Sequence, residues 1–159
     1  MLKFFAATAI LCLICASANT VNAKDLFTAT LTGDQEVPPV DTPASGKAFF
    51  RLNQAETAIE FQLHVNEGLG ITQSHIHCAP AGAPGPIVVF LAGLHAAGLN
   101  IDGKWISNAT ITEASIVNTA CGATVEELAE SMRSGNTYVN VHSLAVPSGE
   151  IRGQIEPTN

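Results

Sequence analysis

Short apolar runs, separated at short intervals by Gly, Pro, Asn or Asp, are the feature that most limits the fold of this 159-residue chain. Many of these runs alternate apolar and polar side chains, which is the period of a β-strand with one buried face. Such runs, with turn residues between them, indicate an all-β sandwich or barrel. The sequence predicts strands at residues 26–33, 46–53, 58–66, 72–79, 86–93, 103–112, 137–144 and 149–156.

One segment has a helical rather than a strand pattern. Thr124 and Glu127 have the spacing of a capping box, and the apolar residues that follow share one helical face. Gly135 is a typical residue at a helix end. We therefore predict one short helix near residues 124–134. No internal repeat or linker divides the chain, so residues 24–159 are expected to form a single domain.

The first 23 residues differ in composition from the rest of the chain. They run from Lys3 through an apolar stretch to small residues at the end of the segment, the pattern of a secretory signal peptide. The apolar stretch is shorter than the roughly 20 residues that cross a bilayer. We therefore expect residues 1–23 to be a signal peptide and the mature protein to be secreted or periplasmic.

Two cysteines, Cys78 and Cys121, remain after removal of this segment. In an oxidising compartment two cysteines suggest one disulfide. On the loop-entropy account, such a bridge contributes roughly 3–4 kcal/mol to stability. The alternative is a pair of free thiols, one of which would bind a metal beside His77.

The charge of the mature chain limits its partners. Six basic and fourteen acidic residues remain once Lys3 is removed, a net charge of −8 with neutral histidines. Nucleic acid calls for a positive surface, so this balance argues against it as a partner. A negative surface mildly attracts cations.

Two of the five histidines, His75 and His77, are separated by one residue in the predicted strand 72–79. Because strand side chains alternate, both point away from the face of Ile76. Their Cα atoms are then about 6.5–7 Å apart, close enough for the rings to share one metal ion with bonds near 2 Å. The alternative is a pair of solvated surface histidines.

A third histidine has the same orientation in the predicted strand 137–144. Val139 and Val141 share the apolar face, so His142 lies on the opposite side. If the two strands are neighbours, His142 is the best candidate for a third ligand. Imidazole ligands suit copper and zinc far better than calcium or magnesium. His64 and His95 are kept as additional candidates, although each is more typical of a surface residue.

Three segments carry a family resemblance: FTATLTGDQEVPPVDTPASGKAFFRL, SHIHCAPAGAPGPIVVFL and YVNVHSLAVPSGEIRGQI. They resemble the CHRD domain, a module named from chordin that also occurs alone in exported microbial proteins. The resemblance covers nearly the whole mature chain. Its motifs EVPP, HIH, NVH and GEIRGQ occur in the family's order, so it implies a single CHRD domain.

The last two segments also resemble, more distantly, the copper-binding regions of copper-zinc superoxide dismutase. That resemblance implies a Greek-key β-sandwich or barrel with copper ligands on the outer face of a sheet, under long loops. It matches His75 and His77 to the H-x-H copper ligands and His142 to the late copper histidine. The histidine-rich zinc loop has no counterpart here, so the resemblance implies a copper-only site.

Other polar residues share the outward face with these histidines. Asn140 and Gln73 are the nearest candidates to orient the imidazoles. Arg152 has two interpretations: the dismutase resemblance implies a guide for anions, and the residues alone favour a structural ion pair with Glu150 or Glu36.

Together these features predict an exported protein that binds, stores or delivers a copper ion, with zinc as the less favoured metal. No acid–base pair or activated nucleophile is visible, because Ser74 and Ser143 face away from the histidines next to them. A copper-only enzyme similar to superoxide dismutase is one alternative. A metal-free extracellular interaction module is another, with a protein or a second copy of the chain as its partner. Neither nucleic acid nor a membrane span is expected.

Overall fold

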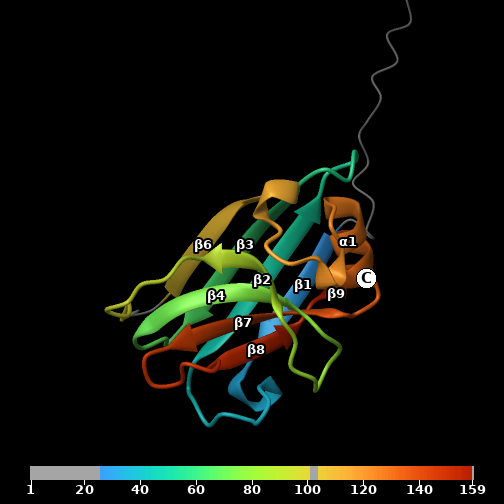
Figure 1. Ribbon diagram of the computed structural model, residues 1–159. Helices are drawn as coiled ribbons and strands as arrows, with labels where there is room; N and C mark the ends of the chain where they lie inside the picture. Colours follow the sequence, from blue (N-terminus) through green and yellow to red (C-terminus); the bar gives the residue numbers. More distant parts are fainter. Residues whose placement is uncertain (1–25, 101–103, 159) are drawn as a thin grey trace, which may run out of the picture.

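The computed structural model describes residues 26–100 and 104–158, and Figure 1 shows two β-sheets that face each other. The expected signal peptide, residues 1–23, lies outside the described residues. The five-stranded sheet has the order β6-β3-β2-β1-β9, and its strands are β6 (Lys104–Ile111), β3 (Ile59–Asn66), β2 (Ser45–Leu52), β1 (Leu26–Leu31) and β9 (Glu156–Pro157). The four-stranded sheet has the order β5-β4-β7-β8, and its strands are β5 (Ile87–Ala92), β4 (Ile71–Cys78), β7 (Thr137–Ser143) and β8 (Ile151–Gln154).

The all-β prediction is confirmed. Each of the eight predicted strands occurs, with ends within two residues of those expected, and β9 is the addition. All strand pairs are antiparallel. The chain passes from one sheet to the other between β3 and β4, between β5 and β6, between β6 and β7, and between β8 and β9. These crossings place β4 beside β7, which is far from it in sequence.

The core lies between the two sheets. Phe50, Phe61 and Leu63 project from the five-stranded sheet, and Ile76 and Val139 project from the other. Burying each such side chain stabilises the fold by about 1.5–3 kcal/mol.

The outer face of the four-stranded sheet is covered as well. Along β2 and β3 buried and exposed residues alternate, as expected for one solvated face. In β7, by contrast, every residue from Thr137 to Ser143 is buried. Loops therefore shield the face on which the sequence places His142.

The single predicted α-helix is confirmed as α1 (Val125–Arg133), at one end of the sandwich (Figure 1). Its capping box is complete, because Thr124 Oγ1 accepts from the Glu127 N–H at 3.2 Å and Glu127 Oε2 accepts from the Thr124 N–H at 3.3 Å. The short 3₁₀ helices are η2 (Gly33–Gln35), η3 (Glu113–Ser115) and η4 (Thr119–Cys121). Among the described residues, no helix has both the length and the apolar character needed to span a bilayer.

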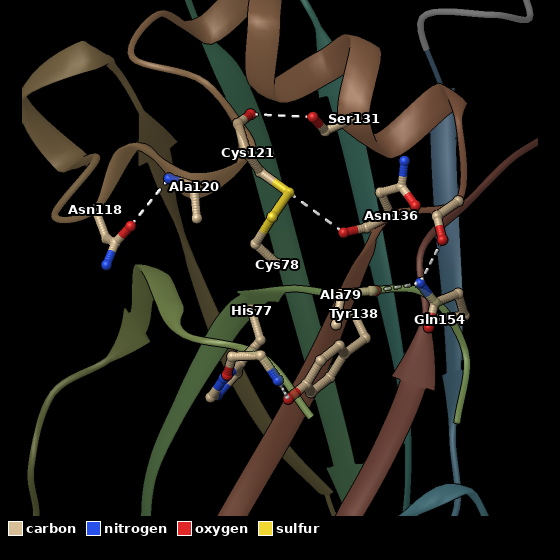
Figure 2. The surroundings of a disulfide bond; sticks show 12 residues. His77, Cys78, Ala79, Asn118, Ala120, Cys121, Ser131, Asn136, Tyr138 and Gln154 are labelled. Atoms are coloured by element: carbon tan, nitrogen blue, oxygen red, sulfur yellow. Dashed lines mark hydrogen bonds between the residues drawn. A yellow bond between two sulfur atoms is a disulfide. The ribbon is translucent and has the colours of Figure 1, made fainter. Parts of the chain in front are cut away.

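The predicted disulfide is present. Cys78, the last residue of β4, is bonded to Cys121 in η4, and their Cα atoms are 5.5 Å apart. Figure 2 shows this bond directly beside His77. The bridge therefore fixes the end of the strand that carries two of the candidate ligands, and it leaves no free thiol at Cys78.

Candidate metal centre

The strands that carry the three histidines are direct neighbours, as the three-ligand prediction requires. In the antiparallel register of β4 and β7, His75 is opposite Asn140 and Gln73 is opposite His142. His142 is thus displaced by two residues from His75 along the same face. The alternation of side chains then places all three imidazoles on the outer side of this sheet.

The three imidazoles form a compact cluster. His75 Nδ1 lies 3.1 Å from His142 Nε2, and each residue offers a ring nitrogen within 4.8 Å of those of the other two. All three side chains are buried, with exposed fractions of 0% for His75, 8% for His77 and 6% for His142. These are not solvated surface histidines, so that alternative is wrong.

Backbone carbonyls orient two of the rings. His77 Nδ1–H donates to Gly85 O at 2.8 Å, and His142 Nδ1–H donates to Pro147 O at 2.9 Å. A carbonyl only accepts, so the proton of each neutral ring sits on Nδ1 and Nε2 presents a lone pair. His77 Nε2 is buried without a hydrogen-bond partner. A buried, unpartnered lone pair of this kind suits a metal ligand.

The hydrogen bond between the other two histidines follows from these orientations. Because His142 Nε2 is an acceptor, the 3.1 Å contact requires His75 Nδ1 to donate its proton. His75 Nε2 is then a second buried nitrogen without a hydrogen-bond partner. The cluster therefore holds one proton between two nitrogens that are close enough to bind a common ion.

The buried environment keeps the three rings neutral. Burial lowers the pKa of His75 to about 3, and His142 and His77 act in the same direction against a smaller opposing effect of Asn140. Burial also lowers the pKa of His77 and of His142, against the opposing effects of the Gly85 and Pro147 carbonyls. Neutral imidazole is the form that binds metal ions, so few protons compete for the site at pH 7.

Gly85 holds the loop that covers His77 close to β4. Its carbonyl accepts from His77, and its N–H donates to the Tyr138 hydroxyl at 3.2 Å. A Cβ atom at this position would lie 2.0 Å from Cys78 O, so glycine is required for the loop to approach β4. Both polar groups of this residue thus hold the loop against the histidine face.

Arg152 fastens the same loop from β8. It donates from Nη2 to the carbonyls of Pro80 at 3.2 Å and Ala83 at 2.9 Å, and its Cζ lies 3.5 Å from the centre of the Tyr138 ring. On its other side Tyr138 stacks on His77, with ring centres 4.8 Å apart (Figure 2). Only 3% of Arg152 is exposed. This burial does not fit an arginine that guides anions from solvent. Arg152 has a structural role instead, but through loop carbonyls rather than through the predicted ion pair with Glu150 or Glu36.

A comparison with known families fits this architecture. The CHRD domain matches residues 27–155. The chain belongs to the CHRD domain family. No curated protein matches the chain. The EVPP, HIH, NVH and GEIRGQ segments of this CHRD domain all lie within the matched range. The resemblance to superoxide dismutase stays a prediction.

Two histidines of the CHRD domain lie away from the cluster. His64 is on the outer face of β3, in the other sheet, where its ring contacts Phe49 at a centroid distance of 5.7 Å. His95 is exposed in the loop after β5. The structure does not bring either residue to the other three. The alternation of apolar and polar residues correctly predicted that His64 points outward, but it does not indicate which sheet a strand joins.

The residues predicted to orient the imidazoles lie at the site in different ways. Asn140 is 3% exposed, directly across from His75, and its Oδ1 is buried without a hydrogen-bond partner. Gln73 is half-buried across from His142. Phe90 was not predicted to lie at the site; its ring packs edge-on against His75, with ring centres 4.7 Å apart, and it is 50% exposed. The sequence indicated only that Phe90 belongs to the apolar run of the predicted strand 86–93.

Proposed function

We propose that this CHRD domain binds one copper ion through His75, His77 and His142. The observation that carries the proposal is the buried trio of imidazole nitrogens within 4.8 Å of one another, whose lone pairs are set by hydrogen bonds to loop carbonyls. The role that fits best is the binding, storage or delivery of copper.

The dimensions of the cluster suit a single ion. Bonds of about 2.0–2.1 Å to imidazole nitrogens allow two such nitrogens to be at most about 4 Å apart. The 3.1 Å between His75 Nδ1 and His142 Nε2 is within this limit, and the nitrogens of all three residues lie within 4.8 Å of one another, so the trio needs only a small contraction around an ion. Binding through His75 Nδ1 requires its proton to leave that nitrogen.

The donor set favours copper among the metals that imidazole binds. Three neutral nitrogens are present, and the thiol ligand of the alternative prediction is ruled out because Cys78 is in the disulfide. For a given site of this type, affinity for divalent ions rises along the first transition series to a maximum at Cu²⁺ and falls again at Zn²⁺.

Binding rather than turnover is supported by the cover over the site. A copper ion would supply one-electron redox chemistry, which is what the dismutase alternative requires. The residues around the cluster instead exclude solvent: Gly85 closes over His77, and Arg152 donates to loop carbonyls rather than facing outward. A superoxide dismutation assay on copper-loaded protein distinguishes the two roles. We expect no turnover that depends on His77.

Copper binding itself is tested by titrating the purified protein with Cu²⁺ against a competing chelator. We expect one saturable site and an electron spin resonance spectrum with nitrogen hyperfine coupling. His77→Ala should abolish this binding, whereas His95→Ala, at an exposed histidine, should leave it unchanged. The absence of a saturable site would contradict the proposal and favour the metal-free interaction module. Full binding by His77→Ala would show that copper binds at another site.

Export is part of the same proposal. The Cys78–Cys121 disulfide supports it, since such bonds persist in oxidising compartments, and so does the composition of residues 1–23. Mass spectrometry of the protein from the host's extracytoplasmic fraction should give a mature N-terminus at Lys24. An intact Met1 in a cytoplasmic fraction would contradict it.

A further inference from the structure

A buried carboxylate lies close to the histidine face. Glu36, in the loop after η2, is 8% exposed, and its Oε1 is buried without a hydrogen-bond partner. Burial raises the pKa of Glu36, against the opposing effects of Arg152, the Val37 backbone and Asn140. Burying an ionisable group costs free energy. The burial of Glu36 therefore suggests a role for this side chain other than closing the loop.

Glu36 meets Asn140 at the turn between β7 and β8. Gly149, in this turn, has a φ of +132°, and a Cβ atom on it would lie 2.5 Å from Glu36 Oε1 and 2.8 Å from Asn140 Nδ2. Glycine leaves the space in which these two side chains approach each other. A carboxylate only accepts hydrogen bonds, so it favours the amide orientation with Nδ2 toward Glu36.

This orientation leaves the amide oxygen for the histidines. Asn140 is opposite His75 in the β-ladder, and Asn140 Oδ1 and His75 Nε2 are both buried atoms without a hydrogen-bond partner. In the metal-free protein His75 carries its proton on Nδ1, so both atoms are acceptors and no hydrogen bond joins them. If His75 binds an ion through Nδ1, its proton must sit on Nε2, which then requires an acceptor. The Asn140 side chain lies within hydrogen-bonding reach of His75, and its free Oδ1 can accept this proton.

We propose that Glu36 is a positioning residue for the copper site: its carboxylate holds the Asn140 amide so that Oδ1 accepts the Nε2 proton of metal-bound His75. This inference rests on the proposed copper function. It assigns a role to the acidic residue of the EVPP segment, and it links the loop of residues 32–44 to the metal ligands through one amide.

The test compares two buried glutamates. Glu36→Met removes the acceptor and keeps an unbranched side chain of similar length. Glu150→Met is the matched control, because Glu150 is also 8% exposed but accepts from Thr42 Oγ1 at 2.7 Å. Loss of a hydrogen-bond partner behind a ligand weakens metal binding about 10- to 100-fold. Because Glu36 acts on His75 through Asn140, we expect the lower end of that range, about 10-fold, for the Cu²⁺ dissociation constant of Glu36→Met, and a change below about threefold for Glu150→Met.

A conservative variant and a spectrum exclude a merely structural role. Glu36→Gln keeps an acceptor oxygen and should recover part of the lost affinity. In wild-type protein loaded with Cu⁺, ¹H–¹⁵N spectra should show His75 protonated on Nε2, with His77 and His142 protonated on Nδ1. The spectrum tests the tautomer of His75 on which the inference depends, and Glu36→Gln tests Glu36 itself if Glu36→Met fails to fold.

The outcomes separate the inference from the function. If the wild type binds Cu²⁺ and Glu36→Met binds as tightly, the role of Glu36 is overturned and the copper site stands. Equal losses in Glu36→Met and Glu150→Met, or a His75 ring without an Nε2 proton in the Cu⁺ form, would also overturn it. If the wild type binds no Cu²⁺, the proposed function itself fails.

Discussion

His75 Nδ1 and His142 Nε2 lie 3.1 Å apart, although the two residues are separated by 67 positions in the chain. The contact exists because β4 and β7 are antiparallel neighbours in a sheet whose outer face is covered by loops. In the absence of metal, one proton joins the two nitrogens. In the proposed copper-bound form, the ion replaces that proton.

Removal of His142 should therefore disrupt copper binding. We expect His142→Ala to weaken Cu²⁺ affinity by at least about 100-fold, beyond the effect of losing a group that only supports a ligand. His64→Ala is a suitable control, since His64 is half-buried on the outer face of the other sheet. Competition titrations measure both variants. Equal affinities would show that His142 is not a ligand.

The stability of the metal-free protein should fall in acid. Unfolded histidine titrates near pH 6.5, whereas burial lowers the pKa of His75 in the folded protein to about 3. Between these values the unfolded chain binds more protons than the folded one, so the free energy of unfolding decreases as the pH falls. The slope is at most about 1.4 kcal/mol per pH unit for each histidine that stays neutral.

Urea unfolding of the metal-free protein at pH 7, 5.5 and 4.5 measures this loss. His75→Gln removes one titrating group, and it should show a shallower decline than the wild type over the same range. His95→Gln, at the exposed histidine, should decline as the wild type does. A wild-type stability that does not change between pH 7 and 4.5 would contradict neutral buried imidazoles.

The strands and the orientation of the histidines were predictable because both follow from a period of two. Ile76 and Val139 identify the core side of their strands, so His75 and His142 had to lie on the other side. The covering of that side was not predictable in the same way. Alternation distinguishes two faces of a strand, but it does not indicate whether loops cover the outer one.

The groups that support the site depend on contacts distant in sequence. The carbonyls of Gly85 and Pro147 carry no side-chain signal, so nothing in the sequence assigned them to His77 and His142. Arg152 was expected to form an ion pair, but it hydrogen-bonds two loop carbonyls and lies over a tyrosine ring. Polar residues near a turn have many candidate partners, and only the packing of the loops selects among them.

The disulfide should support both the fold and the site. It closes a loop with a sequence separation of 43, for which the loop-entropy account gives about 4 kcal/mol. Cys78 is also adjacent to His77 in β4.

We expect a Cys78→Ser, Cys121→Ser double variant to lose about 2–4 kcal/mol of unfolding free energy and to bind Cu²⁺ more weakly. Urea unfolding and Cu²⁺ titration measure the two effects. Unchanged affinity in a folded variant would show that the bridge serves stability alone.

The close approach of Gly85 to β4 offers a test of the loop cover. A Cβ atom there would lie 2.0 Å from Cys78 O, so Gly85→Ala must displace the loop and lengthen the hydrogen bond from His77 Nδ1 to the Gly85 carbonyl. We expect Cu²⁺ affinity to fall about 10-fold or more, because His77 loses the group that fixes its tautomer.

Gly93→Ala is the matched control, since a Cβ atom at Gly93 meets nothing within 4 Å. Cu²⁺ titration should separate the two variants. If Gly85→Ala folds and binds as tightly as Gly93→Ala, the carbonyl of Gly85 does not position His77.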